Sequence, residues 1–262
     1  MFFHQALEYL KYILLSGHRK GHGLHSPFVF NLVSRVLRNK ISPDIVLIIE
    51  KIRKRMISDQ RSISVIDLGY GSSRMKTSIR KVSDIARYSA IPKKYGILLS
   101  NMAAEFGEPC IVEFGTSLGI STMYMAASCH DAIVYTMEGC PETSEIAEKN
   151  FQEAGIKNII SLTGSFDQLL PLIRKEAGSP GLVFIDGNHR KAPVISYFNQ
   201  MAEISSGKTV VIIDDIHSSG EMEEAWIEIK KHEKVTFSID IFRMGLIFFR
   251  EGMNHFNYVI RY

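Results

Sequence analysis

Glycines and a carboxylate follow two neighbouring apolar runs in the middle of the chain, a pattern typical of a site for a ribose-containing ligand. The first run continues into a glycine loop between Ile111 and Gly119, with the sequence IVEFGTSLG. A helical pattern and a second apolar run follow, and Glu138 ends that run, 23 residues after Gly115. In an open α/β sheet, a carboxylate at this place accepts ribose hydroxyls, and the glycines let a ligand approach the backbone.

The sequence does not predict a pyrophosphate in this ligand. The dinucleotide-binding fingerprint G-x-G-x-x-G needs three glycines, and the matching positions here are Gly115, Ser117 and Ile120. The phosphate-binding loop G-x-x-x-x-G-K-[ST] is also missing from the sequence. A second glycine segment, VIDLGYG at residues 65–71, lacks the carboxylate that would complete a ribose site, and it is interpreted as a strand and a turn.

Three aspartates and two histidines follow later apolar runs. Asp186 ends the fourth run of the series, and Asp214 and Asp215 end the fifth. Parallel strand ends converge on one crevice, where three carboxylates would repel one another unless a cation or a proton compensated. His189 and His217 lie beside them and are candidates for a general base, because imidazole titrates near neutral pH. The simpler interpretations are a turn at Asp186-Gly187 and a helix cap at Asp214-Asp215.

The elements that would position these residues alternate in type from about residue 111 onward. Short β-type runs are each followed by a segment of helical character, which predicts βαβ units and a parallel sheet that is buried on both faces. The runs are CIVEF, AIVYTM, NIISL, GLVFID and TVVIID. At the end of the chain, VTFSIDIF and MGLIFFR are separated by a tight connection, which predicts an antiparallel hairpin that closes the sheet.

The composition is that of a globular protein. Hydrophobic residues make up 45% of the 262 residues, charged residues 23%, and no apolar run approaches the ~18 residues of a membrane-spanning helix. The opening segment MFFHQALEYLKYILL is interrupted by Glu8 and Lys11 and is predicted to be an amphipathic helix rather than a signal peptide. Three cysteines without metal-ligand spacing fit a reducing compartment, so a cytoplasmic location is expected.

Charge divides the chain into two regions. Residues 1–94 hold 18 Lys and Arg against 6 Asp and Glu, a net charge of +12, whereas residues 95–262 hold 13 against 22, a net charge of −9. This division predicts a basic N-terminal region, which could meet nucleic acid, an anionic substrate or a membrane surface, or pack against the acidic part. Apolar residues at helical spacing predict helices over residues 3–14, 29–39 (VFNLVSRVLRN) and 44–57.

A polar, cationic loop separates the first two helical patterns of the basic region. It spans residues 17–28 and contains three glycines and the histidines His18, His22 and His25. Glycines permit a mobile backbone, so the loop is interpreted as a lid over the acidic crevice. A plain connector and an RNA-binding arm are the alternatives.

Five motifs together resemble the strand-end motifs of class I S-adenosylmethionine-dependent methyltransferases. They are EFGTSLGIST, YTMEG, TGSFDQLLP, FIDGNH and IIDDIH, and the resemblance covers about residues 95–250. Within that class they are most similar to the O-methyltransferases of catechol, small-molecule or sugar type. The resemblance implies an α/β domain over residues 95–262: a Rossmann-like, doubly wound, mostly parallel seven-stranded sheet with an antiparallel C-terminal hairpin, following a helical N-terminal appendage.

The resemblance also assigns residues to the cofactor. S-adenosylmethionine would be held at its methionine part by Glu113 and the backbone of Gly115, Thr116 and Ser117, with Ser121 near the carboxylate. Glu138 would accept the ribose hydroxyls, and Asp186 would also face the cofactor. Gly164, Ser165 and Phe166 would border the adenine, although plain core packing is an alternative for Phe166.

The resemblance further implies a divalent metal, with Mg²⁺ suited to oxygen ligands from Asp186, Asp214 and Asp215. Such a metal would hold two vicinal oxygens of the acceptor and favour its deprotonated form. Many relatives carry a second acidic residue where this chain has Asn188. Asn does not accept a proton at neutral pH, which puts that role in doubt and leaves Asp186, His189 and His217 as the catalytic candidates.

The function implied is metal-assisted O-methylation of a small hydroxylated molecule. The first alternative is an RNA or ribosomal-protein methyltransferase that uses the basic N-terminal region, although N-methyltransferases of bases usually carry N-P-P-[YF] where this chain has Asp186-Gly187-Asn188-His189. The second is a cofactor-binding protein without catalysis. A small-molecule acceptor is the expected partner, and nucleic acid and a homodimer remain open.

Overall fold

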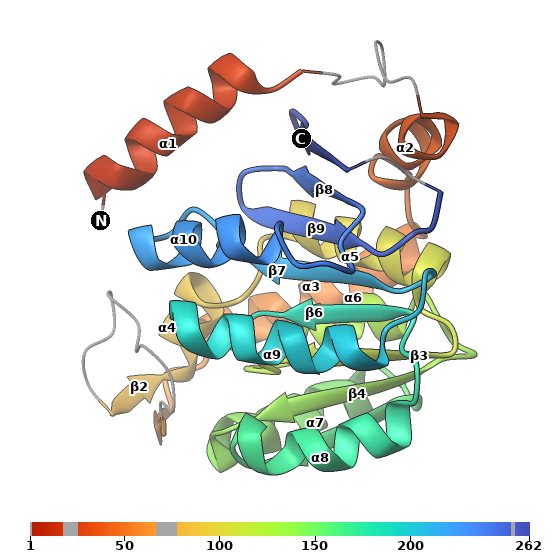
Figure 1. Cartoon of the computed structure of the whole chain (residues 1–262). Helices are drawn as coiled ribbons and strands as arrows, with labels where there is room; N and C mark the ends of the chain where they lie inside the picture. Colours follow the sequence, from red (N-terminus) through yellow and green to blue (C-terminus); the bar gives the residue numbers. More distant parts are fainter. Residues whose placement is uncertain (1, 18–25, 67–77, 253–254) are drawn as a thin grey trace.

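An eight-stranded sheet forms the centre of the computed structural model, which describes residues 2–17, 26–66, 78–252 and 255–262 (Figure 1). Strands β3, β6 and β7 are buried along their whole length, as expected for apolar runs covered on both faces. In spatial order the strands are β10 (Phe256–Val259), β8 (Phe237–Asp240), β9 (Met244–Phe248), β7 (Val210–Asp214), β6 (Leu182–Ile185), β3 (Cys110–Phe114), β4 (Ile133–Glu138) and β5 (Ile159–Thr163).

The strand directions confirm the predicted fold class. Strands β7, β6, β3, β4 and β5 are parallel to one another, whereas β9 is antiparallel to both β7 and β8. The C-terminal hairpin is therefore β8–β9, as expected. The sheet has one strand more than the predicted seven, because the last segment of the chain returns and adds β10 parallel to β8 at the edge.

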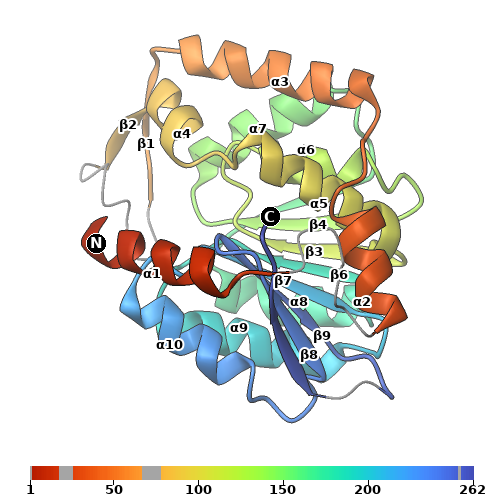
Figure 2. The same ribbon diagram turned by 90° about the horizontal axis from the view of Figure 1, so that it is seen from above.

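Helices cover both faces of the sheet, as Figure 2 shows from above. Each face has its own hydrophobic cluster: one includes buried residues of α3, α5, α6 and α7, and the other includes those of α8, α9 and α10. The helix bounds are α3 (Pro43–Ser58), α5 (Lys93–Phe106), α6 (Ile120–Ala126), α7 (Pro141–Glu153), α8 (Phe166–Ala177), α9 (Lys191–Ile204) and α10 (Gly220–Ile229).

The N-terminal region contains helices at all three predicted places, with α1 (Phe2–Leu15) at the first, two short helices at the second and α3 at the third. The short helices are α2 (Pro27–Asn31), whose N-cap is Ser26, and the π-helix η1 (Leu32–Val36). A two-stranded antiparallel sheet, β1 (Ser62–Ser64) and β2 (Ile79–Lys81), and α4 (Val82–Tyr88) follow α3. The predicted turn of the glycine segment VIDLGYG falls within residues 67–77, and the histidines of the predicted lid fall within residues 18–25, both outside the described residues.

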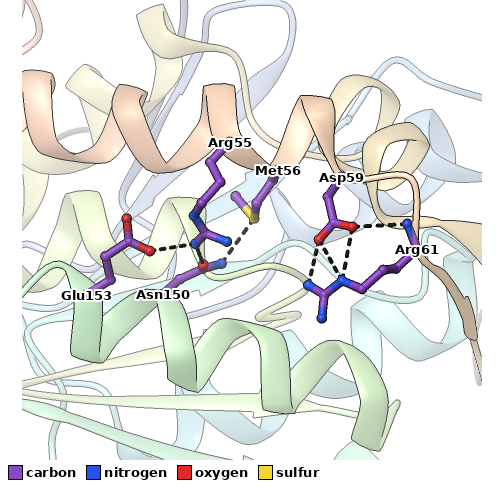
Figure 3. A network of polar contacts seen from close by, with 6 residues as sticks. All are labelled: Arg55, Met56, Asp59, Arg61, Asn150 and Glu153. Carbon is purple, nitrogen blue, oxygen red and sulfur yellow. Dashed lines mark hydrogen bonds and ion pairs between the residues drawn. The ribbon is translucent and has the colours of Figure 1, made fainter.

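The basic region packs against the rest of the chain. Val29, Leu32, Ile49 and Met56 belong to the same hydrophobic cluster as the residues of α5 and α6, so the core continues across position 94. Polar contacts join α3 to α7 as well (Figure 3): Arg55 forms an ion pair of 2.7 Å with Glu153 and donates to Asn150 Oδ1 at 2.6 Å. Arg55 is thus one cation of the basic region that pairs within the chain.

No helix among the described residues is long and apolar enough to cross a membrane.

Candidate active site

The strand ends of the parallel sheet form one edge, and the backbone is unusual there. Four residues other than glycine have positive φ angles among the described residues, Ser117, Asn188, Asp215 and Phe242. The first three come one to three residues after β3, β6 and β7, and Phe242 lies in the β8–β9 turn. Since β9 is antiparallel to β7, this turn reaches the same edge. Strained backbone conformations cluster at functional sites because only a tightly determined surrounding maintains them.

Two glycines of the β3–α6 loop are required by close packing. Gly115 has a φ of 100°, and a Cβ atom there would lie 2.4 Å from the carbonyl oxygen of Asp186. Gly119 has a φ of 82°, and its Cβ would lie 2.4 Å from the ring of Phe151. Both conditions favour glycine, because it has no side chain and adopts left-handed conformations without strain. The loop is thereby fixed against the end of β6 and against α7.

Glu113 is buried beneath this loop and does not reach the crevice. Its Oε2 atom accepts hydrogen bonds from Thr122 Oγ1 at 2.5 Å and Thr136 Oγ1 at 2.7 Å, and its buried Oε1 atom has no partner. Burial raises the pKa of Glu113 to about 7, although the hydrogen bonds from Thr122 and Thr136 oppose the rise. Glu113 and Ser121, both expected at the methionine part of the cofactor, are thus both buried in the protein.

Glu138 lies at the end of β4, where the sequence places it, and it holds the glycine loop. Its Oε2 atom accepts from the Ser117 amide at 2.7 Å, and its Oε1 atom accepts from the Cys140 amide at 2.9 Å. Burial is the main cause that raises its pKa. A carboxylate has about four lone-pair sites, so two remain for ligand hydroxyls. The Gly115 and Thr116 amides donate to the Met137 carbonyl oxygen at 3.0 and 3.1 Å, and they are not directed at the crevice.

Phe166 packs in the core cluster below the strand ends. Its ring lies edge-on to Phe114 and Tyr197, with centroid distances of 5.5 Å in both pairs. It also closes over Gly187, where a Cβ atom would lie 2.5 Å from the ring. Ser165 caps α8, and Gly164 donates from its amide to the Glu138 carbonyl oxygen at 2.9 Å. The segment 164–166 thus lies beside Glu138. The contacts of Phe166 are those expected from plain core packing, which was the alternative to a place beside the adenine.

The three aspartates do not assemble into the expected metal site. Asp214 is fully buried, and its carboxylate forms a bidentate ion pair with the Arg243 guanidinium, with N–O distances of 2.6 and 2.9 Å. Asp215 lies 3.8 Å from the same guanidinium. Arg243 therefore supplies the positive charge that the sequence left open, and both carboxylate oxygens of Asp214 are already paired with it. The prediction of metal ligands at Asp186, Asp214 and Asp215 does not fit this geometry.

The helix-cap interpretation of Asp214-Asp215 is also wrong. The N-cap of α10 is Ser219, whose side chain accepts from the Met222 amide at 3.2 Å. Burial and the neighbouring Asp214 raise the pKa of Asp215, and Arg243 only partly offsets this. The pKa of Asp186 lies well above its usual range for the same reasons.

The two candidate histidines have different surroundings. His189 lies with its Nε2 atom 3.5 Å from Asp186 Oδ1, and a third of its side chain is exposed. In contrast, both ring nitrogens of His217 have carboxylate partners, Glu223 at 3.0 Å and Asp240 at 2.8 Å. A general base needs a free nitrogen lone pair directed at the substrate. Both nitrogens of His217 already face carboxylates, whereas the ring of His189 is partly exposed beside Asp186.

Asn188 also has a structural role beside the site. Its φ is 53°, its amide nitrogen donates to the Tyr197 hydroxyl at 3.3 Å, and its buried Oδ1 atom has no partner.

Sequence reasoning missed Arg243 in this site. The predicted hairpin was the available signal, because an antiparallel β9 places the residue before Met244 next to the end of β7.

Comparisons with known proteins agree with this geometry. A family model described as a methyltransferase domain matches residues 112–216. O-methyltransferase imqG of Aspergillus flavus is 27% identical over 117 residues, which cover 42% of this chain and 47% of that protein. Catechol O-methyltransferase of Mycobacterium tuberculosis is 28% identical over 134 residues, which cover 50% of this chain and 59% of that protein. The chain thus spans about half the length of the curated relatives it matches.

The fold is also that of solved methyltransferases. The O-methyltransferase TomG of Streptomyces achromogenes, solved in complex with S-adenosylmethionine, superposes with a TM-score of 0.54 at 21% identity. The superposition covers 62% of this chain and 82% of that one. The resemblance to class I S-adenosylmethionine-dependent methyltransferases is therefore confirmed, with the family match confined to the β3–β7 part of the sheet.

Proposed function

We propose that the protein is an S-adenosylmethionine-dependent O-methyltransferase that acts on a small hydroxylated molecule. The observation that carries the proposal lies where β3 and β4 end side by side. There the Ser117 amide of the glycine loop donates a hydrogen bond to the Glu138 carboxylate and holds the two together. The relatives are O-methyltransferases by name, and one of them acts on catechol. Because such names describe other proteins, the acceptor class is part of the proposal.

The crevice residues fit the cofactor at its ribose. Glu138 is only partly buried and retains acceptor sites beyond its two amide donors. Because Gly115 has no side chain, the end of β3 packs closely against Asp186 at the end of β6. A ligand at this edge would therefore contact both strand ends. Glu113 would act from below by holding Thr122 and Thr136, and so the loop, rather than by touching the cofactor.

The chemistry requires an oriented acceptor and a place for its proton. S-adenosylmethionine supplies a methyl group that is already electrophilic. The protein has to direct the acceptor oxygen in line with it and to take up the hydroxyl proton. His189 is the residue proposed for the proton, with Asp186 as the carboxylate that orients its ring. Arg243 neutralises Asp214 and keeps the aspartates from repelling each other.

Metal assistance is not part of this mechanism. The carboxylate that would have to provide two ligand oxygens is occupied by Arg243, and the described aspartates do not form a group whose ligand atoms all lie within 4.8 Å of one another. The deprotonation step is therefore assigned to His189 alone.

Calorimetric titration with S-adenosylhomocysteine tests the cofactor assignment. Glu138→Gln should weaken binding by about 1–3 kcal/mol, because a charged acceptor of ribose hydroxyls is lost. The matched control is Glu145→Gln on α7, an exposed glutamate that should leave the affinity unchanged. Equal affinity in wild type and Glu138→Gln, or preferential binding of NAD, would contradict the proposal.

Methyl transfer to a panel of catechols and other small phenols tests the chemistry. His189→Gln should lower kcat by roughly 10²- to 10⁴-fold, the usual contribution of a general base, without changing cofactor affinity. Activity in the wild type should persist in excess EDTA. Loss of activity in EDTA would contradict this mechanism and favour a metal at the aspartates. The same loss in a Glu8→Gln/Glu223→Gln variant would show that the metal does not act through Glu8 and Glu223, a separate group of possible ligands that is described below.

A further inference from the structure

A second group of side chains with metal-binding atoms lies outside the proposed active site, between α1 and α10. It consists of Glu8 on α1, His217 in the loop after β7, and Glu223 on α10. One ligand atom from each lies within 4.8 Å of the other two, and each residue is partly buried. Figures 1 and 2 show α1 beside α10. We propose that these three residues bind one divalent transition-metal ion, with Zn²⁺ as the representative ion.

The orientation of His217 supports a ligand role for its Nδ1 atom. Nδ1 faces Glu223 Oε1 at 3.0 Å, while Nε2 faces Asp240 Oδ2 at 2.8 Å. Histidine ligands of metals almost always donate their second ring nitrogen to a carboxylate or carbonyl, which fixes the tautomer and the ring. Asp240 is itself held by the Phe242 amide at 2.8 Å, and the Phe242 ring stacks on His217 with centroids 5.4 Å apart.

The charges at this site also call for a cation. The carboxylates of Glu8, Glu223 and Asp240 surround one imidazole, and 12%, 21% and 14% of their side chains are exposed. In the described structure Lys11 balances Glu8 across an ion pair of 2.5 Å. Lys11 is half exposed, so it can turn to solvent. A dication at Nδ1 and the two glutamates would take over the neutralisation that Lys11 now provides for Glu8.

The chemistry of the ligands selects the class of ion. One imidazole nitrogen and two carboxylates suit Zn²⁺ and its first-row neighbours, whereas Mg²⁺ and Ca²⁺ prefer all-oxygen sites. Three protein ligands also leave a coordination position for water. This site differs from the aspartate cluster in residues, in position and in ligand type.

The ion would tie the N-terminal helix to the catalytic part of the chain. Without it, α1 is held by the Tyr12 hydroxyl, which donates to the Ile260 carbonyl oxygen at 2.7 Å, and by the edge-on contact of Tyr9 with Phe242. Through the ion, Glu8 would be linked to His217 and Glu223, which lie more than 200 residues further along the chain. The role is structural, and cofactor binding is not expected to depend on it.

Titration of the full chain with Zn²⁺, against a competing chelator dye, tests the proposal. One ion should bind per chain, and Glu8→Gln and Glu223→Gln should each weaken its binding at least tenfold. Glu221→Gln, on the same turn of α10, is the matched control and should bind Zn²⁺ like the wild type. Lys11→Met should bind at least as tightly, because the competing cation is removed.

Other histidines need a separate control. A variant with His18, His22 and His25 changed to Ala should retain the site. No bound Zn²⁺, binding that persists in a Glu8→Gln/Glu223→Gln double variant, or binding that is lost with the three N-terminal histidines would each overturn the proposal. The affinity for S-adenosylhomocysteine in the same variants shows whether the chain is folded. It also keeps this result separate from the proposed methyl transfer.

Discussion

Glu113 is predicted to make the stability of the protein depend on pH in an unusual direction. Burial raises its pKa to about 7 in the folded chain, against an ordinary value of 4.5. The folded state then binds its proton more tightly than the unfolded state. The stability associated with the protonated carboxyl is fully present below pH 4.5 and is lost as the pH rises through 7.

The size of the effect follows from the two pKa values. One pKa unit corresponds to about 1.4 kcal/mol, so the ionised carboxylate destabilises the folded state by about 3 kcal/mol above pH 7. Glu113→Gln removes the charge while its oxygen still accepts from Thr122 and Thr136. The amide nitrogen takes the place of Oε1, which has no partner in either case.

Denaturant unfolding of both proteins at pH 5 and pH 8 measures this difference. The free energy of unfolding of Glu113→Gln relative to wild type should increase by about 2.5 kcal/mol between the two pH values. Other titrating groups are present in both proteins and cancel in the comparison. A difference that stays constant with pH would refute the reasoning, since it would mean that Glu113 is already ionised in the folded state at pH 5.

Two further predictions concern the strand ends. Gly115→Ala should destabilise the fold by more than Gly155→Ala, as measured by thermal unfolding. Both glycines have positive φ, but only a Cβ atom at Gly115 would meet another atom within 4 Å. Equal losses of stability would show that the close approach of Gly115 to Asp186 does not matter. Arg243→Met should cost about 3–5 kcal/mol in denaturant unfolding because it leaves Asp214 buried and unpaired. Adding Asp214→Asn should recover part of that loss, and a double variant no more stable than the single one would argue against the pair.

Local pattern was sufficient to predict the part of the fold between β3 and β7. Apolar runs with strand propensity alternate with helical segments between Cys110 and Asp214, and such alternation permits little other than a parallel sheet. The places of Glu138 and Asp186 follow directly, since parallel strands end at the same edge. The hairpin β8–β9 could also be predicted from local pattern, because a tight connection between two strands is a local feature.

Partners of charged side chains could not be predicted in this way. Arg243 is 29 residues beyond Asp214 and reaches it only because β9 lies antiparallel to β7. His217 looks like a free histidine in the sequence, yet the fold places Glu223 and Asp240 on its two nitrogens.

The sequence by itself determined which residues lie at the edge of the sheet that carries the candidate site, because strand and helix periodicity is encoded in neighbouring residues. Only the tertiary structure decided what those residues can do there. It placed the Arg243 guanidinium, rather than an open set of oxygens, beside Asp214, and it buried Glu113 below the loop. Charge compensation and desolvation depend on groups distant in the chain, and these two quantities determine whether a carboxylate binds a metal, holds a proton or supports a loop.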